Sequence, residues 1–221
     1  MDRDVIDAAW RGLRQAAGTP ASPELLESAI AVGLLQNAAG AAASLRASTD
    51  EGAAEVAHKH AVALADRGWT GDAELIAQLD GSVAGLRRLR VELDAVGDAL
   101  ADERGGYLDL TDGMVWPTSV LEDGDVDDID PEEEPDRFLF VDGWGRRDGW
   151  SDMVDFAGGL DDATAREALL AAVQGKGAFR RFQAALDRHE RHRAAWRVFS
   201  SERRSGRARA WLLEQGIEPL L

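Results

Sequence analysis

The sequence of 221 residues contains no cysteine. Disulfide bonds, thiolate chemistry and zinc sites with cysteine ligands are therefore excluded, and the composition fits a reducing cytoplasm. No apolar run approaches the length that crosses a bilayer, and the start, MDRDVIDAAWRGL, lacks the basic and then apolar regions of a signal peptide. We expect a cytoplasmic protein with no membrane association.

Positive charge is scarce, since 25 Lys and Arg residues stand against 41 Asp and Glu residues and give a net charge of −16. A field of this sign repels phosphate, so general affinity for nucleic acid is disfavoured and any such binding must be local. Hydrophobic residues make up 45% of the chain, which is enough for the core of one large domain or two small ones.

Nucleophile and nucleotide motifs are also missing. There is no G-x-S-x-G turn, and the glycines of Gly175-Lys176-Gly177 lack the spacing and the following Ser or Thr of a Walker loop. His189 and His192 are one helical turn apart, but neighbouring arginines oppose a cation there. We expect no metal site, no cofactor and no catalytic residues, and the chain is not expected to be an enzyme.

Carboxylates near the predicted strands leave a lesser alternative open. Such side chains could form a hydrolytic or divalent-ion site, although turn and capping roles explain them more simply. The residues concerned are Asp109, Asp112, Asp142 and Asp155.

Helical periodicity dominates the first hundred residues. Ser22 is expected to cap a helix that starts at Pro23 and continues to Leu35. His58 and His60 point about 200° apart on a helix, so one is expected to be packed and the other solvated. Further helices are expected at about 4–17, 49–66, 72–79 and 83–102, while the alanine-rich stretch 38–43 is either a closely packed helix or a frayed connection.

The period changes at Gly105-Gly106. Two short strands at 107–110 and 114–116, joined by an Asp-Gly turn, and a third strand at 137–141 predict a small antiparallel sheet. Helices follow, with Ser151 as one expected cap and Asp161 or Asp162 as another. A break is expected near Ser205-Gly206, because Trp196 and Phe199 would otherwise project about 130° away from Trp211.

An acidic loop is expected between the second and third strands, at about 119–136. Ten acids fall among the fifteen residues from Glu122 to Asp136, so this segment should be mobile and dispensable for folding. Lys176 to Arg209 instead carries eleven Lys and Arg residues against three acids. The two segments could both be solvated, could pair with each other, or could regulate a surface for nucleic acid or a partner.

The stretch from Gly175 to Gly216 opens with a Gly-Lys-Gly turn into a basic helix. Backbone N–H groups at such a helix start, surrounded by cations, could hold a phosphate or carboxylate. The candidate anion site consists of Lys176, Gly177, Arg180 and Arg181, although the same glycines could simply turn the chain between two helices.

Aromatic residues recur at helical spacing through this stretch. They are expected to be core residues that fasten the C-terminal helices to the small sheet. The rings are those of Phe179, Phe182, Trp196, Phe199 and Trp211.

Several of these motifs occur together in one known family. YLDLTDGMVWP, an acidic loop, DRFLFVDG, a DMVDF helix, QGKGAFRRFQAAL and a W-x-x-F ending resemble UPF0158, a bacterial family of uncharacterised function. The upstream HKHAVALADRGWTGDAELIAQL resembles the helical extension of actinobacterial members. The resemblance implies a small α+β domain and a cytoplasmic bacterial protein. It implies no reaction and supplies no catalytic residues.

The sequence thus predicts an α+β protein, mostly α-helical, with an N-terminal helical region at 1–90. A domain at 91–221 should contain a three-stranded antiparallel sheet and C-terminal helices. The leading functional hypothesis is a non-enzymatic protein that binds a protein partner, of unspecified identity and with its oligomeric state open. The alternative is a phosphate-recognising or nucleic-acid-associated protein that uses the GKGAFRR helix start.

Overall fold

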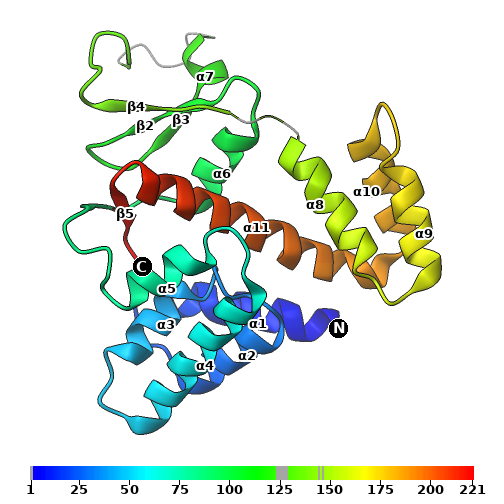
Figure 1. Cartoon of the computed structure of the whole chain (residues 1–221), viewed down its shortest axis with the longest axis horizontal. Helices are drawn as coiled ribbons and strands as arrows, with labels where there is room; N and C mark the ends of the chain where they lie inside the picture. Colours follow the sequence, from blue (N-terminus) through cyan, green and yellow to red (C-terminus); the bar gives the residue numbers. More distant parts are fainter. Residues whose placement is uncertain (1, 123–128, 144, 146) are drawn as a thin grey trace.

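A computed structural model describes residues 2–122, 129–143, 145 and 147–221. Its elements surround one long helix, α11 (Arg193–Glu214), as Figure 1 shows. The N-terminal helices lie along one side of α11, α8 to α10 lie beside its first half, and the three-stranded sheet lies beyond its other end. This arrangement of helices with a small sheet is an α+β fold, as predicted.

The N-terminal helices are α1 (Arg3–Ala16), α2 (Pro23–Ala31), α3 (Ala39–Arg46), α4 (Glu51–Arg67) and α5 (Asp72–Leu79). Ser22 caps α2 as predicted, because its hydroxyl accepts the N–H of Leu25 at 3.3 Å. The alanine-rich stretch forms α3, and α4 ends at Gly68, whose φ of 61° favours glycine. His60 is buried and His58 is exposed, which confirms the expected division between the two histidines.

The predicted course of α2 is wrong at its end. The helix stops at Ala31 instead of reaching Leu35, and Gly33 takes a φ of 79°. Leu34 and Leu35 are buried in the connection that follows. The apolar residues of this stretch therefore predicted correctly that it is buried, but they did not predict that it is a connection and not a helix.

The predicted helix at 83–102 is also wrong in its first half. Residues 87–89 form strand β1 (Arg87–Leu89), and helix α6 (Leu93–Ala101) begins only afterwards. β1 pairs in parallel with β5 (Ile217–Pro219), and Arg87 lies opposite Ile217. A three-residue strand whose partner is near the other end of the chain gives no periodic signal in its own sequence.

The three-stranded antiparallel sheet is confirmed, with strand order β3-β2-β4. β2 (Gly106–Asp109) pairs with β3 (Val115–Pro117) and with β4 (Phe138–Val141). At the turn between β2 and β3, Gly113 has a φ of 80°, and a Cβ there would lie 1.8 Å from the Arg90 carbonyl oxygen. Only glycine fits at this position of the turn.

The acidic segment begins with an unpredicted short helix, α7 (Thr118–Glu122). Residues 123–128, at the centre of the predicted mobile loop, lie outside the described residues, so the mobility of the loop stays a prediction. Two acids at its described edges form ion pairs, Glu122 with Arg104 and Glu134 with Arg137. Among the described residues, the basic C-terminal stretch pairs with acids outside this segment, such as Asp7 and Asp98.

Helices α8 (Arg147–Gly158), α9 (Ala163–Ala172) and α10 (Ala178–Arg188) form a three-helix unit. Asp162 caps α9 as expected, but α8 starts before Ser151, which lies inside the helix. Phe182 is fully buried in this unit, 4.9 Å from the ring of Trp196. Trp196 and Phe199 also pack here and not against the sheet, so the role predicted for these rings is wrong, whereas Trp211 does lie in the core beside the sheet.

The expected break at Ser205-Gly206 is wrong, because α11 continues through it as one helix of 22 residues. Gly206 allows the backbone at Thr70 and Gly71 to approach, and a Cβ on it would lie 2.2 Å from the Thr70 carbonyl oxygen. Trp196 and Phe199 pack in the core of the three-helix unit, whereas Trp211, farther along the same helix, packs in the core beside the sheet.

A buried polar network joins α11 to the N-terminal helices. The Glu202 side chain accepts the backbone N–H groups of residues 35–37 at 2.7–3.0 Å and a guanidinium N–H of Arg67 at 2.8 Å. Arg67 also pairs with Asp72 at 2.6 Å. Arg209, only 1% exposed, donates to the side-chain oxygens of Gln36 and Gln78. Burial lowers the pKa of Arg209 to about 10.

This network carries balanced charge, with two arginines and two carboxylates. Buried charges that are paired and hydrogen-bonded cost far less than isolated ones. The network therefore fixes α11 relative to both the N-terminal helices and the rest of the chain. The predicted domain boundary near residue 90 stays a prediction. Ala194 and Val198 of α11, from the C-terminal side of that boundary, belong to the core of the N-terminal helices.

His60 beside this network predicts a pH-dependent stability. Its Nε2 lies 2.9 Å from the Leu35 carbonyl oxygen and must donate to it, and the buried Nδ1 has no hydrogen-bond partner among the described residues. Burial lowers the pKa of His60 below its ordinary value of 6.5, so the unfolded chain binds the proton more readily. This contribution to the free energy of unfolding is present at neutral pH and is lost as the pH falls below about 6.5, by up to about 1.4 kcal/mol per pH unit.

Urea unfolding at about pH 7.5 and pH 5.5 measures this effect. The decrease on acidification should be smaller in His60→Gln than in the wild type. His58→Gln, two residues away on the exposed side of α4, is the matched control and should retain the wild-type decrease. Equal decreases in all three proteins would contradict the prediction.

Candidate functional site

The GKGAFRR stretch forms the turn between α9 and α10 and the first turn of α10. Gly175 and Gly177 have φ values of 70° and 77°, so both glycines serve the turn. Arg181 folds back over this turn and donates to the carbonyl oxygens of Ala172 at 3.1 Å and of Gly175 at 3.2 Å, and also to those of residues 174 and 176. Its guanidinium closes the C-terminal end of α9.

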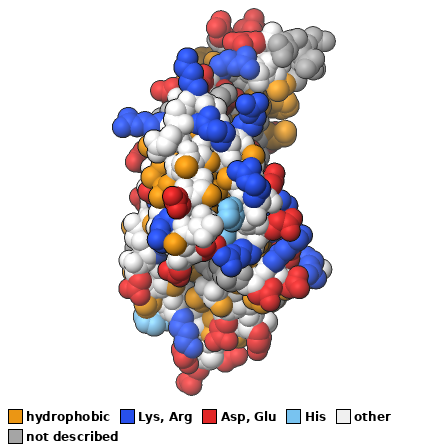
Figure 2. Space-filling view, turned by 90° about the vertical axis from the view of Figure 1, so that its right-hand side faces the viewer, with side chains coloured by type: hydrophobic (Ala, Val, Ile, Leu, Met, Phe, Trp, Pro, Cys, Tyr) orange, Lys and Arg blue, Asp and Glu red, His pale blue; other side chains and the backbone are white. Residues whose placement is uncertain are grey.

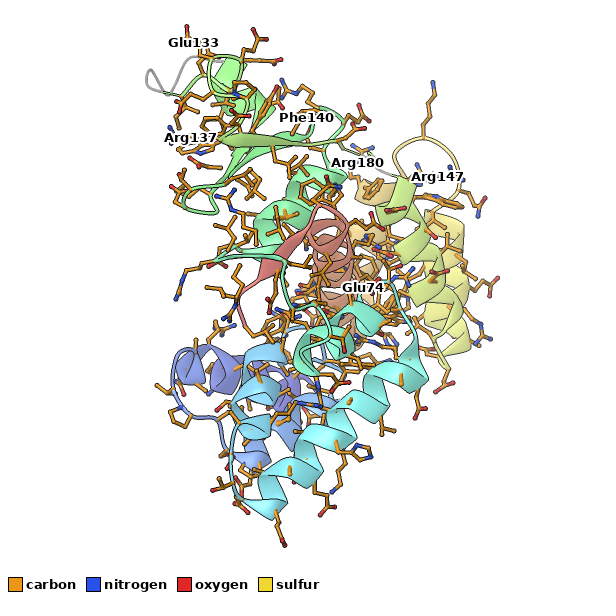
Figure 3. All side chains as sticks on the ribbon, turned by 60° about the vertical axis from the view of Figure 1, so that its left-hand side comes forward. Glu74, Glu133, Arg137, Phe140, Arg147 and Arg180 are labelled. Carbon is orange, nitrogen blue, oxygen red and sulfur yellow. The ribbon has the colours of Figure 1, made fainter. Side chains whose placement is uncertain are left out.

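The other two predicted cations point outward. Lys176 and Arg180 are exposed, and neither has an ion-pair partner among the residues that the structure describes. The start of α8 lies at the same end of the three-helix unit as the turn before α10 (Figure 1), and its first residue, Arg147, labelled in Figure 3, is exposed. The structure thus separates Arg181, which serves the turn, from a group of three exposed cations, Arg147, Lys176 and Arg180.

Two exposed aromatic rings accompany these cations. Phe179, predicted to be a core residue, is 40% exposed, so that prediction is wrong. Its ring packs beside Gly149, where an added Cβ would lie 3.2 Å from it. Trp150 is 44% exposed, and its indole N–H donates to the Val173 carbonyl oxygen at 3.0 Å. We refer to Arg147, Trp150, Lys176, Phe179 and Arg180 as the α8–α10 patch.

Figure 2 shows the face of the molecule that carries these helices. Lys and Arg side chains are spread over its upper and middle parts, interspersed with hydrophobic ones, while Asp and Glu side chains lie at its top, along its edges and at its lower end. A chain with a net charge of −16 therefore presents local positive charge on this face.

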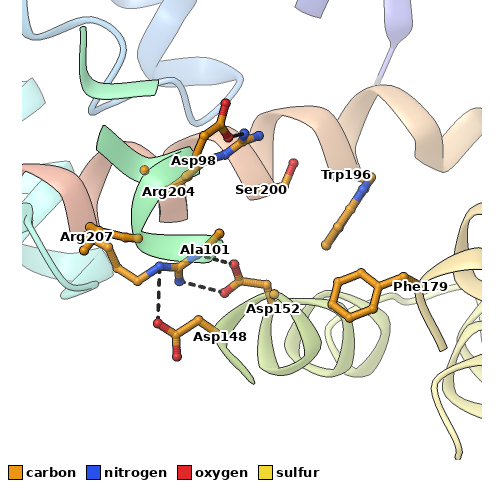
Figure 4. A pocket seen from close by; sticks show the side chains of 12 residues that line it. Asp98, Ala101, Asp148, Asp152, Phe179, Trp196, Ser200, Arg204 and Arg207 are labelled. Atoms are coloured by element: carbon orange, nitrogen blue, oxygen red, sulfur yellow. Dashed lines mark hydrogen bonds and ion pairs between the residues drawn. The ribbon is translucent and has the colours of Figure 1, made fainter. Parts of the chain in front are cut away.

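Beside the patch lies a hollow of about 220 Å³ between α6, α8, α10 and α11, which we call the aromatic hollow. The rings of Phe179 and Trp196 face its interior from one side (Figure 4). Gly97 of α6 lies against the Arg204 side chain, where a Cβ would lie 2.5 Å from Cγ. The remaining lining residues are Asp98, Leu100, Ala101, Asp148, Gly149, Asp152, Ser200 and Arg207.

Ion pairs neutralise the acids of this hollow. Arg207 pairs with Asp152 at 2.6 Å and lies 3.7 Å from Asp148, and Arg204 pairs with Asp98 (Figure 4). Asp152 is almost fully buried and also accepts from Arg203 at 2.9 Å. Hydrogen bonds from these two guanidinium groups occupy both carboxylate oxygens of Asp152. The arrangement suits recognition of a side chain more than acid–base chemistry.

The other sequence candidates do not converge on this place. Asp109 pairs with Arg137 at 2.7 Å, and its pKa is lowered by hydrogen bonds from Arg137 and Thr111, which outweigh the opposing effect of burial. Asp112 accepts the N–H of Met114 in its turn, and Asp155 pairs with Arg203. Each of these carboxylates has a structural partner.

The histidine pair takes a different geometry from the one expected. α10 ends at Arg188, and a 3-10 turn, η1 (Glu190–His192), separates it from α11. His192 lies 3.1 Å from Asp162, the cap of α9. Within the described ranges, His, Asp and Glu side chains nowhere gather in threes as metal ligands do. No helix of the described residues has the length and apolar character needed to cross a membrane.

Sequence reasoning missed the aromatic hollow because its walls come from four helices. The available signal was spacing, since Asp148 and Asp152, like Arg203 and Arg207, are four residues apart and share a helix face. Spacing alone could not show that these two faces meet.

Comparison with known proteins agrees with the motifs. The sequence model of a family described as "Uncharacterised protein family (UPF0158)" matches residues 85–221. A UPF0158 protein of Pseudomonas aeruginosa is 28% identical over 137 residues, which cover 61% of this chain and 88% of that protein. No solved structure matches the chain.

Proposed function

Since the chain belongs to the UPF0158 family, whose description assigns no activity, we propose that it is a non-enzymatic protein that binds an acidic segment of a partner protein. The observation that carries this proposal is the α8–α10 patch, where two exposed aromatic rings accompany three exposed cations that have no ion-pair partner among the described residues. The bacterial cytoplasm is the proposed place of this interaction, in keeping with the absence of cysteine.

The composition of the patch favours a protein as the ligand. Arg, Trp and Phe are enriched at protein interfaces, where an aromatic anchor surrounded by polar contacts supplies most of the binding free energy. Phe179 lines the aromatic hollow as well as the patch, so an apolar side chain of the partner can enter the hollow there. Acidic residues next to that side chain would then meet Arg147, Lys176 and Arg180.

The runner-up is recognition of phosphate or nucleic acid by the same cations. Lys176 and Arg180 are available for it, whereas Arg181 already serves the turn. Such binding would weaken steeply with salt, in proportion to the number of phosphates contacted. The net charge of −16 repels an acidic protein segment as it repels phosphate, so either ligand must bind through this local patch. The experiment below separates the two ligands.

Site-specific photo-crosslinking in a bacterial host tests the proposal. A photoreactive residue replaces Phe179 in one protein and Phe140 in the other. Phe140 is the control, because it is 45% exposed but lies on β4 of the sheet and does not belong to the patch. We expect one protein to be crosslinked from position 179 and not from position 140.

Charge reversal gives the second arm. Glutamate at positions 147, 176 and 180 together should abolish the crosslink from position 179, while Arg88→Glu, on the exposed strand β1, should not. A crosslink to nucleic acid that is lost at moderate salt would favour the runner-up. Equal crosslinking from positions 179 and 140 would refute both.

A further inference from the structure

A second hollow lies between α1 and α11, on the other side of Arg204 and Ser200 from the aromatic hollow. It has a volume of about 540 Å³, within the usual range of small-molecule sites. We call it the arginine hollow. Its lining residues are Asp7, Trp10, Arg11, Arg14, Arg197, Ser200, Ser201 and Arg204.

Helical spacing explains why these side chains meet. Asp7, Trp10, Arg11 and Arg14 recur three and four residues apart and share one face of α1. Residues 197, 200, 201 and 204 do the same on α11. An ion pair between Arg197 and Asp7 holds the two faces together.

The charges of the hollow are not balanced. Four arginines line it with one carboxylate. Asp7 is occupied by Arg197 and by Arg3 at 3.4 Å, and Arg204 is paired with Asp98 outside the hollow. Within the described part of the chain, Arg11 and Arg14 have no ion-pair partner and are exposed. Two guanidinium groups on one helix face, next to two serine hydroxyls, match the donors that a phosphate group requires.

Trp10 adds a flat apolar surface at the same place. Its ring is partly buried against the N-terminal core and also lines the hollow. A planar ring stacked on an aromatic side chain is the usual way in which a base is held without reading its edges. We propose that the arginine hollow binds a nucleoside monophosphate, with the phosphate at Arg11 and Arg14 and the planar base against Trp10.

This site shares Ser200 and Arg204 with the aromatic hollow, but none of its residues belongs to the α8–α10 patch. It uses α1, which precedes the family match at residues 85–221, together with α11, which lies within it. Neither Arg11 nor Arg14 belongs to the α8–α10 patch, so each proposal can fail without the other.

Isothermal titration of the full chain with AMP, inorganic phosphate and adenosine at low salt tests the inference. We expect AMP to bind saturably, phosphate to bind more weakly and adenosine not to bind. The double variant R11Q/R14Q should weaken AMP binding at least about tenfold, because each charged hydrogen bond to phosphate is among the strong ones. The double variant R147Q/R180Q removes the same charge from the α8–α10 patch and should bind AMP as the wild type does.

Trp10→Leu completes the test, because it keeps an apolar side chain but removes the flat ring. It should weaken AMP binding and leave phosphate binding unchanged. Circular dichroism verifies that each variant is folded. The inference is overturned if AMP fails to bind, if AMP binds no tighter than phosphate or adenosine, or if R11Q/R14Q binds AMP as tightly as R147Q/R180Q.

Discussion

Glu202→Ala is expected to lower the free energy of unfolding by about 3–5 kcal/mol, the range seen when one partner of a buried ion pair is removed. The carboxylate is fully buried, and it accepts three backbone N–H groups, the side-chain amide of Asn37 at 2.7 Å and the guanidinium of Arg67. Alanine leaves these donors unsatisfied and leaves the charge of Arg67 with Asp72 alone. Urea denaturation followed by circular dichroism measures the loss.

Two other substitutions test the cause. Glu202→Gln keeps the shape and one oxygen acceptor but removes the charge, so its loss should be intermediate. Glu214→Ala changes an exposed glutamate in the last turn of the same helix and should alter stability by no more than about 0.5 kcal/mol. If Glu202→Ala is as stable as Glu214→Ala, the network does not hold α11 in place.

Phe182→Ala is expected to cost about 3–5 kcal/mol, because it removes a fully buried ring and leaves a cavity. The ring packs at 4.9 Å, edge to face, against Trp196, whose own ring contacts Phe156 at 5.2 Å. Removing the Phe182 ring therefore also weakens the packing of the three-helix unit against α11. Thermal and urea unfolding of the purified variant measure it.

Phe179→Ala is the matched control, three residues earlier on the same helix. Its ring is 40% exposed, so truncation should cost less than about 1.5 kcal/mol and leave the fold intact. The same variant should lose partner binding if the α8–α10 patch acts as proposed. A wild-type stability for Phe182→Ala would contradict the description of this core.

The comparison of Phe179 with Phe182 shows what sequence patterns could predict. Periodicity placed both rings on one helix face. Phe179 lies at the edge of that face, where its ring packs beside Gly149 and stays exposed. The three-stranded sheet was predictable because its turn and its alternation are local. β1 and β5 were not predictable, because each depends on a partner strand far away in the sequence.

The candidate sites show the same limit. The glycines and cations of GKGAFRR were recognised from sequence, but the use of Arg181 by carbonyl oxygens depends on how the turn closes. Gly206 was expected to break the helix, but its role is to let the backbone at Thr70 pack closely against an unbroken helix. Both hollows lie between helices that are distant in the sequence. Residue spacing within one helix could therefore indicate a charged helix face, but it could not show that two such faces pack together.

The large sequence separation between α11 and the first helices has a consequence for biosynthesis. Ala194 and Val198 of α11 complete the core of the first helices, and its Glu202 binds the backbone of Leu35, 167 residues earlier. At about 5–20 residues per second, translation delivers these groups on the order of ten seconds after the helices that need them. The part of this core that Ala194 and Val198 cover stays open on the nascent chain during that interval, which makes it the period of greatest risk of misassembly.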